Sequence, residues 1–158
     1  MQDPGNAGTL IRAADAAGAG LAAATAGSVD LLNPKTVRST AGSLFHLPVA
    51  AHQRLPELLE AARSAGAQIL AADGRAALDL DELADAAAAQ RPGDGADLRR
   101  PTVWLFGNEA QGLSEEEKGL ADARVAVPLH GRAESLNVGM AATVCLYASA
   151  RAQRRRTR

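Results

Sequence analysis

One stretch near the end of the chain, residues 102–147, constrains the fold more than any other. An apolar run from Val103 to Phe106 stops at a glycine-containing polar turn, Gly107 to Glu109. A second apolar run stops at Pro128, and a polar loop follows it. In α/β folds, parallel strands that end in such loops form a ligand-binding crevice at their carboxyl ends. We therefore expect the binding site in this stretch.

A long helix of small residues is expected after the second loop. Ser135 to Asn137 opens it, and the free N–H groups and positive dipole end of a helix make a polar anchoring point. Taken alone, the same residues also fit an ordinary helix cap. From Val138 to Ala148 the helix is apolar almost all round. This pattern predicts burial on more than one side, against the core and against a second subunit.

The composition limits the class of protein. A chain of 158 residues is expected to form one domain with a real core. The only cysteine, Cys145, excludes disulfide frameworks and cysteine-rich zinc sites, and its apolar neighbours predict a buried thiol. The three histidines show no metal-ligand spacing, so no metal is expected. Since no run approaches the ~20 apolar residues of a membrane span and no signal peptide is visible, we expect a cytoplasmic protein.

Charge is unevenly distributed along the chain. The net charge is −1, yet five of the 17 basic residues are arginines in the last eight positions, which leaves 12 basic residues against 18 acids elsewhere. A basic tail on an acidic body either contacts nucleic-acid phosphates or forms a solvated helix end. The tail arginines that we consider for RNA contact are Arg151, Arg154 and Arg155.

The remaining sequence alternates helical and strand patterns, which predicts an α/β fold with a mostly parallel sheet flanked by helices. Asn6 is expected to cap a first helix. Phe45 to Val49 is expected to form a strand, and residues 73–100 a surface insertion. Further helices are expected at 9–17, near 36–40, and at 54–65, 114–120 and 137–154, and further strands at 21–26, 68–72, 102–106 and 124–127.

Common nucleotide-binding motifs are missing or misplaced. Gly18-Ala19-Gly20 follows a helix, whereas the dinucleotide fingerprint follows a strand, so a nicotinamide-dependent oxidoreductase is disfavoured. No GxxxxGK[ST] phosphate loop is present, which argues against an NTPase.

Three segments, in order, resemble the motifs of the SpoU (TrmH) family of RNA ribose 2′-O-methyltransferases. They are DPGNAGTLIRAADAAGAG, LFGNEAQGLS and VPLHGRAESLNVGMAATVCLYASAR. A fourth segment, NPKTVRSTAGSLFHLPV, is similar to the central part of bacterial ribosomal-RNA members. The resemblance covers nearly the whole chain.

The resemblance implies the SPOUT fold, with its C-terminal part threaded into a deep trefoil knot, and a homodimer. The implied activity is 2′-O-methylation of a ribose in RNA by S-adenosylmethionine, with ribosomal RNA favoured over transfer RNA. The cofactor would be held by Gly107, Asn108, Val127, Pro128, Leu129, Ser135 and Leu136. The catalytic positions would be Asn6, Arg12, Glu109, Ser135 and Asn137, with Arg12 also contacting RNA.

Arg12 is not expected to act as a base. Family accounts make this arginine a base, but a guanidinium group is protonated at any physiological pH. We therefore expect Arg12 to hold a phosphate and stabilise the developing alkoxide.

Two departures from the family pattern affect the expected function. Members usually have an apolar strand before the Asp-Pro-Gly-Asn turn, whereas this sequence starts at Met1-Gln2. Either the sequence is truncated or its start is misassigned, and one position in the sheet is expected to be empty. Many ribosomal-RNA members also carry an N-terminal RNA-binding domain, which residues 1–158 lack. An RNA-binding or ribosome-assembly protein with weak catalysis is therefore an open alternative.

Overall fold

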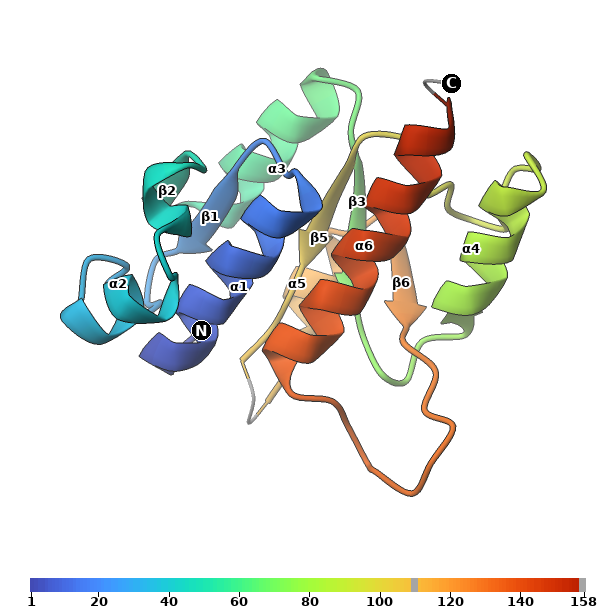
Figure 1. The fold of residues 1–158 in the computed structure, drawn as a ribbon. Helices are drawn as coiled ribbons and strands as arrows, with labels where there is room; N and C mark the ends of the chain where they lie inside the picture. The colour runs from blue at the N-terminus through green and yellow to red at the C-terminus, as the bar shows by residue number, and fades with distance from the viewer. Residues whose placement is uncertain (109–110, 157–158) are drawn as a thin grey trace.

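The computed structural model describes residues 1–108 and 111–156, and it has strands in the middle with helices on both sides (Figure 1). The helices are α1 (Pro4–Ala17), α2 (Pro34–Ser39), α3 (Leu55–Ser64), α4 (Leu80–Ala88), α5 (Glu115–Gly119), α6 (Val138–Arg156) and the 3₁₀ helix η1 (Ser43–Phe45). The strands are β1 (Ala22–Thr25), β2 (Val49–Gln53), β3 (Gln68–Ala72), β4 (Leu78–Asp79), β5 (Thr102–Leu105) and β6 (Ala123–Ala126). This arrangement confirms the predicted α/β class.

The strands form two sheets in which every pair is parallel. One sheet has the order β4-β6-β3-β5, and the other pairs β1 with β2. The central strand β3 is buried over Gln68 to Ala71, as expected for a parallel strand covered on both faces. β6 lies between β3 and β4, both of which precede it in the chain. A C-terminal strand in that position fits the predicted threading, and the trefoil knot itself stays a prediction.

Helix α6 crosses the sheet and packs against α1 (Figure 1). Trp104 of β5 donates its indole N–H to the Ser149 hydroxyl at 3.0 Å, which joins α6 to the sheet. Close contact with α1 depends on Gly139, because a Cβ there would lie 2.7 Å from Cγ2 of Thr9. The helix therefore has one side against the core and one against α1.

The prediction that residues 73–100 form a surface insertion was wrong. This segment contains β4 and α4, and Leu80, Leu83 and Leu98 are buried in the main core cluster with Val125 and Cys145. Asp79 caps α4, because its carboxylate accepts hydrogen bonds from the N–H groups of Asp81 at 2.7 Å and Glu82 at 3.4 Å. Leu80 and Leu83 are three residues apart, as on one face of a helix, and they face the core. The acids between them, Asp81 and Glu82, are exposed to water.

Two local predictions near the N-terminal half were also wrong. Asn6 does not cap α1, because Asp3 does: its carboxylate accepts the Asn6 N–H at 2.7 Å, and Pro4 takes the first helical position. The segment from Phe45 to Val49 is not a strand either. Phe45 ends η1, and β2 begins only at Val49, after Pro48, which has no N–H to donate to a sheet.

Candidate functional site

The predicted crevice residues lie at one end of the sheet. β5 and β6 both run parallel to β3, so their carboxyl ends reach the same edge. The loops that follow these two strands and the start of α1 are at this end of the molecule (Figure 1). The packing of α1 alongside α6 brings segments about 130 positions apart in the sequence into this region.

A hydrogen bond between Asn6 and Asn137 joins the two ends of the chain. The Asn137 Nδ2 donates to Asn6 Oδ1 at 3.1 Å. Asn137 also caps α6, since its Oδ1 accepts the Gly139 N–H at 2.9 Å and its carbonyl accepts the Ala141 N–H at 2.9 Å. The side chain is held by its own helix while it reaches the first turn of α1. Asp3, which fixes Asn6, was not predicted, although an Asp before Pro is a recognisable cap signal.

The loop after β5 folds tightly back on Gly107. A Cβ at this position would lie 2.0 Å from the Gly112 carbonyl carbon and 2.3 Å from the Leu113 nitrogen. Asn108 closes the loop: its carbonyl accepts the Gly112 N–H at 2.9 Å, and its Oδ1 accepts the Gln111 N–H at 2.7 Å. Gly107 is thus required because the main chain of Gly112 and Leu113 approaches it closely. Glu109, the predicted carboxylate of this turn, lies outside the described residues.

The loop after β6, residues 127–137, contains the other predicted contacts. Val127, Pro128 and Leu136 are half-buried, while Leu129 and Ser135 are exposed. Within the described part of the chain, the main chain of residues 127–136 makes no backbone hydrogen bond outside regular elements. Among the described residues, its N–H and C=O groups thus have no main-chain partner outside the regular elements. This segment offers half-exposed apolar side chains together with unused main-chain donors and acceptors.

The arginines that were predicted to contact RNA lie away from the contact between Asn6 and Asn137. Arg12 is exposed on α1, six residues and ~9 Å of helical rise beyond Asn6, and it makes no hydrogen bond or ion pair with the described residues. Arg151 and Arg154 lie at the far end of α6 from Asn137, with ~20 Å of helix between. The side chain of Arg155 is outside the described part. The structure thus brings Asn6 and Asn137 together, and it keeps the arginine tail away from them.

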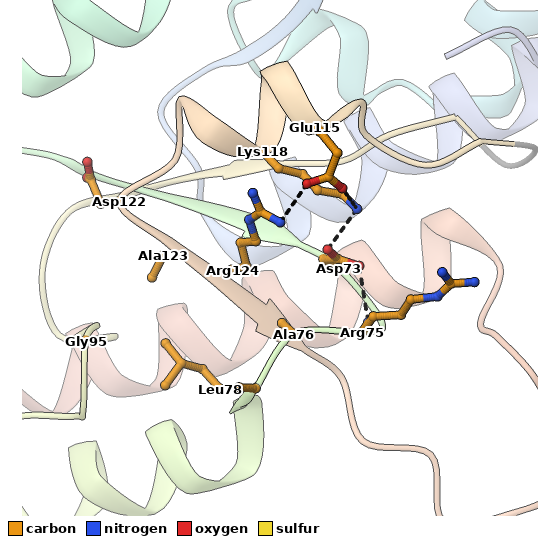
Figure 2. Close-up of a pocket in the computed structure, with 11 residues that line it drawn as sticks. Asp73, Arg75, Ala76, Leu78, Gly95, Glu115, Lys118, Asp122, Ala123 and Arg124 are labelled. Carbon is orange, nitrogen blue, oxygen red and sulfur yellow. Dashed lines mark hydrogen bonds and ion pairs between the residues drawn. The ribbon is translucent and has the colours of Figure 1, made fainter.

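A cavity of about 560 Å³ lies between α5 and β6, away from the predicted crevice (Figure 2). Its wall carries a chain of ion pairs: Lys118 contacts Asp73 at 2.9 Å and Glu115 at 3.1 Å, and Arg124 contacts Glu115 at 3.0 Å. The hydrogen bond from Lys118 lowers the pKa of the Asp73 carboxyl below its usual range, and it raises the pKa of Lys118. Because the charges compensate one another, we interpret this cluster as an attachment of α5 to the sheet.

Asp73→Asn is expected to reduce stability by about 1–3 kcal/mol at pH 7, because it leaves the mostly buried Lys118 with a weaker partner. The folded-state pKa of Asp73 lies below the unfolded value of 3.8, so its contribution is present above that pH and is lost as pH falls through the folded pKa. Urea unfolding from pH 3 to 7 should show the two proteins converging at the acid end. A difference that is constant over this range would contradict the assignment.

The only cysteine of the chain, Cys145, is buried in the core. Burial raises the pKa of the Cys145 thiol to about 12, which makes it unreactive and confirms the predicted buried cysteine. In the described residues, no group of three or more His, Cys, Asp or Glu side chains could hold a metal ion. None of the helices in the same residues is long and apolar enough to cross a membrane.

Comparison with known proteins places this arrangement in a family. Residues 1–147 match the model of the SpoU rRNA Methylase family. The chain is 38% identical over 151 residues to a 23S rRNA (uridine(2479)-2′-O)-methyltransferase of Streptomyces viridochromogenes, covering 94% of this chain and 49% of that protein. It is 33% identical over 147 residues to the 23S rRNA (guanosine(2553)-2′-O)-methyltransferase RlmP of Bacillus subtilis, covering 93% and 54%.

Solved structures agree with the sequence relatives. The SpoU methyltransferase AviRb from Streptomyces viridochromogenes, in complex with AdoMet, superposes with a TM-score of 0.80 at 35% identity, over 99% of this chain and 58% of that one. A TrmH/SpoU tRNA modifying enzyme from A. aeolicus superposes with a TM-score of 0.75 at 25% identity, over 99% and 73%. The chain spans about half the length of the sequence relatives that it matches. From its sequence and its fold, this chain belongs to the SpoU rRNA methylase family.

Proposed function

We propose that the chain transfers a methyl group from S-adenosylmethionine to a ribose 2′-hydroxyl in RNA, and that ribosomal RNA is the substrate. The observation that carries the proposal is the hydrogen bond between Asn6 and Asn137, because it joins the first and third motifs. Family membership supports it, as do the relatives named as 23S rRNA 2′-O-methyltransferases. An RNA substrate of this kind would place the protein in the cytoplasm.

The loop residues have the chemistry that S-adenosylmethionine needs. Adenine is flat and apolar with polar edges, and residues 127–136 offer half-exposed apolar side chains beside unused main-chain groups. We assign the contacts to the two loops that follow β5 and β6. They are Gly107, Asn108, Val127, Pro128, Leu129, Ser135 and Leu136.

The side chains around the cofactor would position the RNA. The bound cofactor supplies a methyl group on a positively charged sulfur, and the ribose oxygen must approach that carbon in line. Arg12 holds the neighbouring phosphate and stabilises the negative charge that develops on the oxygen. Asn6, Asn137, Ser135 and Glu109 orient the ribose and the arginine by hydrogen bonds. The hydroxyl proton leaves to the phosphate or to water, since a guanidinium cannot accept it.

Methyl transfer from labelled S-adenosylmethionine tests the proposal directly. Unmodified 23S ribosomal RNA, 16S ribosomal RNA and bulk transfer RNA are offered in parallel, and the 2′-O-methylated position is mapped by resistance to alkaline cleavage. We expect labelling of ribosomal RNA. Labelling of transfer RNA alone would correct the substrate. RNA binding without any labelling would favour the ribosome-assembly alternative and overturn the enzymatic proposal.

The arginine tail is proposed to contact RNA beyond the reacting nucleotide. Arg151 and Arg154 are exposed at the end of α6, and Arg155 follows them. Their distance from Asn137 corresponds to several nucleotides, so they would add affinity through phosphate charge without touching the reacting ribose.

We also propose that the protein works as a homodimer through the outer face of α6. Met140, Val144 and Tyr147 lie on one side of this helix and are 63%, 43% and 49% exposed. Arg12 borders this face, because its helical neighbours Thr9 and Ala16 both contact α6: Thr9 at Gly139, and the Ala16 carbonyl at the Tyr147 hydroxyl. A dimer formed here would surround Arg12 with a second subunit.

Val144→Glu is expected to weaken self-association at least about tenfold, because it would place an unpaired charge inside the interface. Sedimentation equilibrium measures the effect. Leu32→Glu is the matched control, since Leu32 is 72% exposed on another surface. If both variants associate like the wild type, the outer face of α6 is not the interface.

A further inference from the structure

The segment of residues 33–46 has no role in the proposed methyl-transfer site, although it packs against α1. It contains α2 and η1, and α2 lies beside α1 (Figure 1). The Ser39 hydroxyl donates to the Pro4 carbonyl in the first turn of α1 at 3.1 Å. At the other end of the segment, Nδ1 of His46 lies 3.2 Å from the Asp15 carboxylate. The segment thus runs beside α1 from its first turn to its last.

Arg12 lies at the border between α1 and this segment. Its helical neighbours Gly8 and Asp15, four residues before it and three after it, both face the segment. A Cβ at Gly8 would lie 1.7 Å from the Ser39 hydroxyl oxygen, so the two helices touch there. Residues three or four apart on a helix have Cβ atoms about 5–6 Å from each other. An RNA chain that passes Arg12 therefore comes within reach of residues 33–46.

The segment and its flanks carry positive charge without any acid. Between Asp30 and Glu57 the sequence has three of the 17 Lys and Arg residues, two histidines and no acid, which leaves 14 basic residues against 18 acids elsewhere. Lys35 and Arg38 are exposed and lie three residues apart on α2. Neither forms an ion pair among the described residues. Two such cations on one side of a helix suit neighbouring phosphates of a nucleic acid.

Phe45 is the most exposed large apolar side chain in the described part of the chain, at 80%. The other aromatic side chains have contacts or a proposed role: Trp104 and Phe106 stack with ring centroids 6.3 Å apart, and Tyr147 lies on the outer face of α6. A single exposed apolar side chain is common, so the weight lies in its combination with cations. Phe45 ends η1, a short turn after Arg38. An exposed aromatic ring beside cations is the arrangement on which unpaired nucleic-acid bases stack.

We propose that Phe45 stacks on an unpaired base next to the methylated nucleotide, while Lys35 and Arg38 hold the phosphates on that side of it. The inference rests on the proposed methyl transfer, because it assigns a subsite for the same RNA. The stacked base would hold the RNA strand unpaired beside Arg12, which keeps the reacting ribose accessible.

An RNA strand fits this surface better than a second copy of the chain. A two-fold contact centred here would bring the cations of both copies together, and like charges repel. A single strand instead supplies a flat base for Phe45 and a negative charge for each cation.

Fluorescence anisotropy with two labelled RNA probes tests the proposal on the 158-residue protein without any methyl transfer. One probe is single-stranded decauridylate, and the other is the same ribose-phosphate chain without bases. Phe45→Ala should weaken decauridylate binding at least about fivefold and leave binding of the baseless chain unchanged. Phe45→Trp should bind both probes at least as tightly as the wild type, because it keeps an aromatic face.

Variants of the cations give a different signature. Lys35→Ala and Arg38→Ala should each weaken binding of both probes by the same factor and reduce the slope of log affinity against log salt by about 0.7. Leu32→Ala is the matched control, since it removes an apolar side chain that is 72% exposed at the other end of α2. It should bind both probes like the wild type.

Each alternative gives a distinct result. Wild-type affinity of Phe45→Ala for decauridylate would overturn the stacking role, even if the protein methylates RNA. An equal loss on both probes would mean that the ring supports the cationic surface and meets no base, which would overturn it too. Weaker self-association of Phe45→Ala without RNA, measured by sedimentation equilibrium, together with unchanged probe binding, would assign the ring to a second copy. If the probes behave as expected but labelled cofactor methylates no RNA, the methyl-transfer proposal fails and the stacking surface stands as part of an RNA-binding protein.

Discussion

Arg12→Ala is expected to lower the rate of methyl transfer at least about 10²-fold, the effect of removing one donor that stabilises a developing oxyanion. The affinity for S-adenosylmethionine should change less than about twofold, because Arg12 lies ~9 Å of helix beyond Asn6 and outside the two cofactor loops. Stability should change by no more than about 0.5 kcal/mol, since the side chain is exposed and has no partner among the described residues. Single-turnover kinetics and cofactor titration measure the two effects separately.

Two further variants separate the role of Arg12 from a general charge effect. Arg12→Lys keeps the positive charge but loses the planar fork that holds two phosphate oxygens, so it should recover only part of the rate. Arg151→Ala removes another exposed arginine, at the far end of α6, and should weaken RNA binding without changing the rate at saturating RNA. A cofactor affinity that falls in step with activity in Arg12→Ala would contradict the proposed role.

The positions of the candidate-site loops could be predicted from the sequence, because their motifs are short and lie at element boundaries. Gly107 follows an apolar run and Asn137 precedes a helix, and both positions are visible in the sequence. The contact between Asn137 and Asn6 was implied only by the family resemblance, since no local pattern encodes a separation of 131 residues. The packing of α1 alongside α6 creates this contact, because both helices begin at the same end of the molecule.

The errors in the fold come from places where tertiary packing overrides a local pattern. Leu80 and Leu83 have acidic neighbours in the sequence, so the pattern predicted a surface segment. In the structure they lie on α4, which follows β4, and they are buried in the core cluster with Val125. β2 has the sequence VAAHQ, which carries little strand propensity, and it forms a strand because β1 lies beside it. The separation of the strands into two sheets was implied only by the expected empty position in the sheet.

Gly107→Ala is expected to have the second large effect, a loss of S-adenosylmethionine affinity of at least about tenfold, or ~1.4 kcal/mol. The added Cβ would lie 2.0 Å from the Gly112 carbonyl carbon and 2.3 Å from its oxygen, and these are main-chain atoms that no rotamer change can move away. The loop must therefore open, which breaks the Gly112–Asn108 hydrogen bond and displaces the main chain assigned to the cofactor. Because Leu113 is buried beside Leu105 in the second core cluster, part of the strain should appear as about 1–3 kcal/mol of lost stability.

Gly119→Ala provides the matched control for this loop variant, because the same added methyl group meets no atom within 4 Å at the end of α5. It should bind the cofactor like the wild type and be equally or slightly more stable, since alanine is the better helix residue. Isothermal titration at a temperature where all three proteins are fully folded separates lost affinity from lost stability. If Gly107→Ala loses stability but binds S-adenosylmethionine with wild-type affinity, the tight turn serves the fold alone. The cofactor contacts would then have to come from residues 127–136, whose unused main-chain groups need no help from β5.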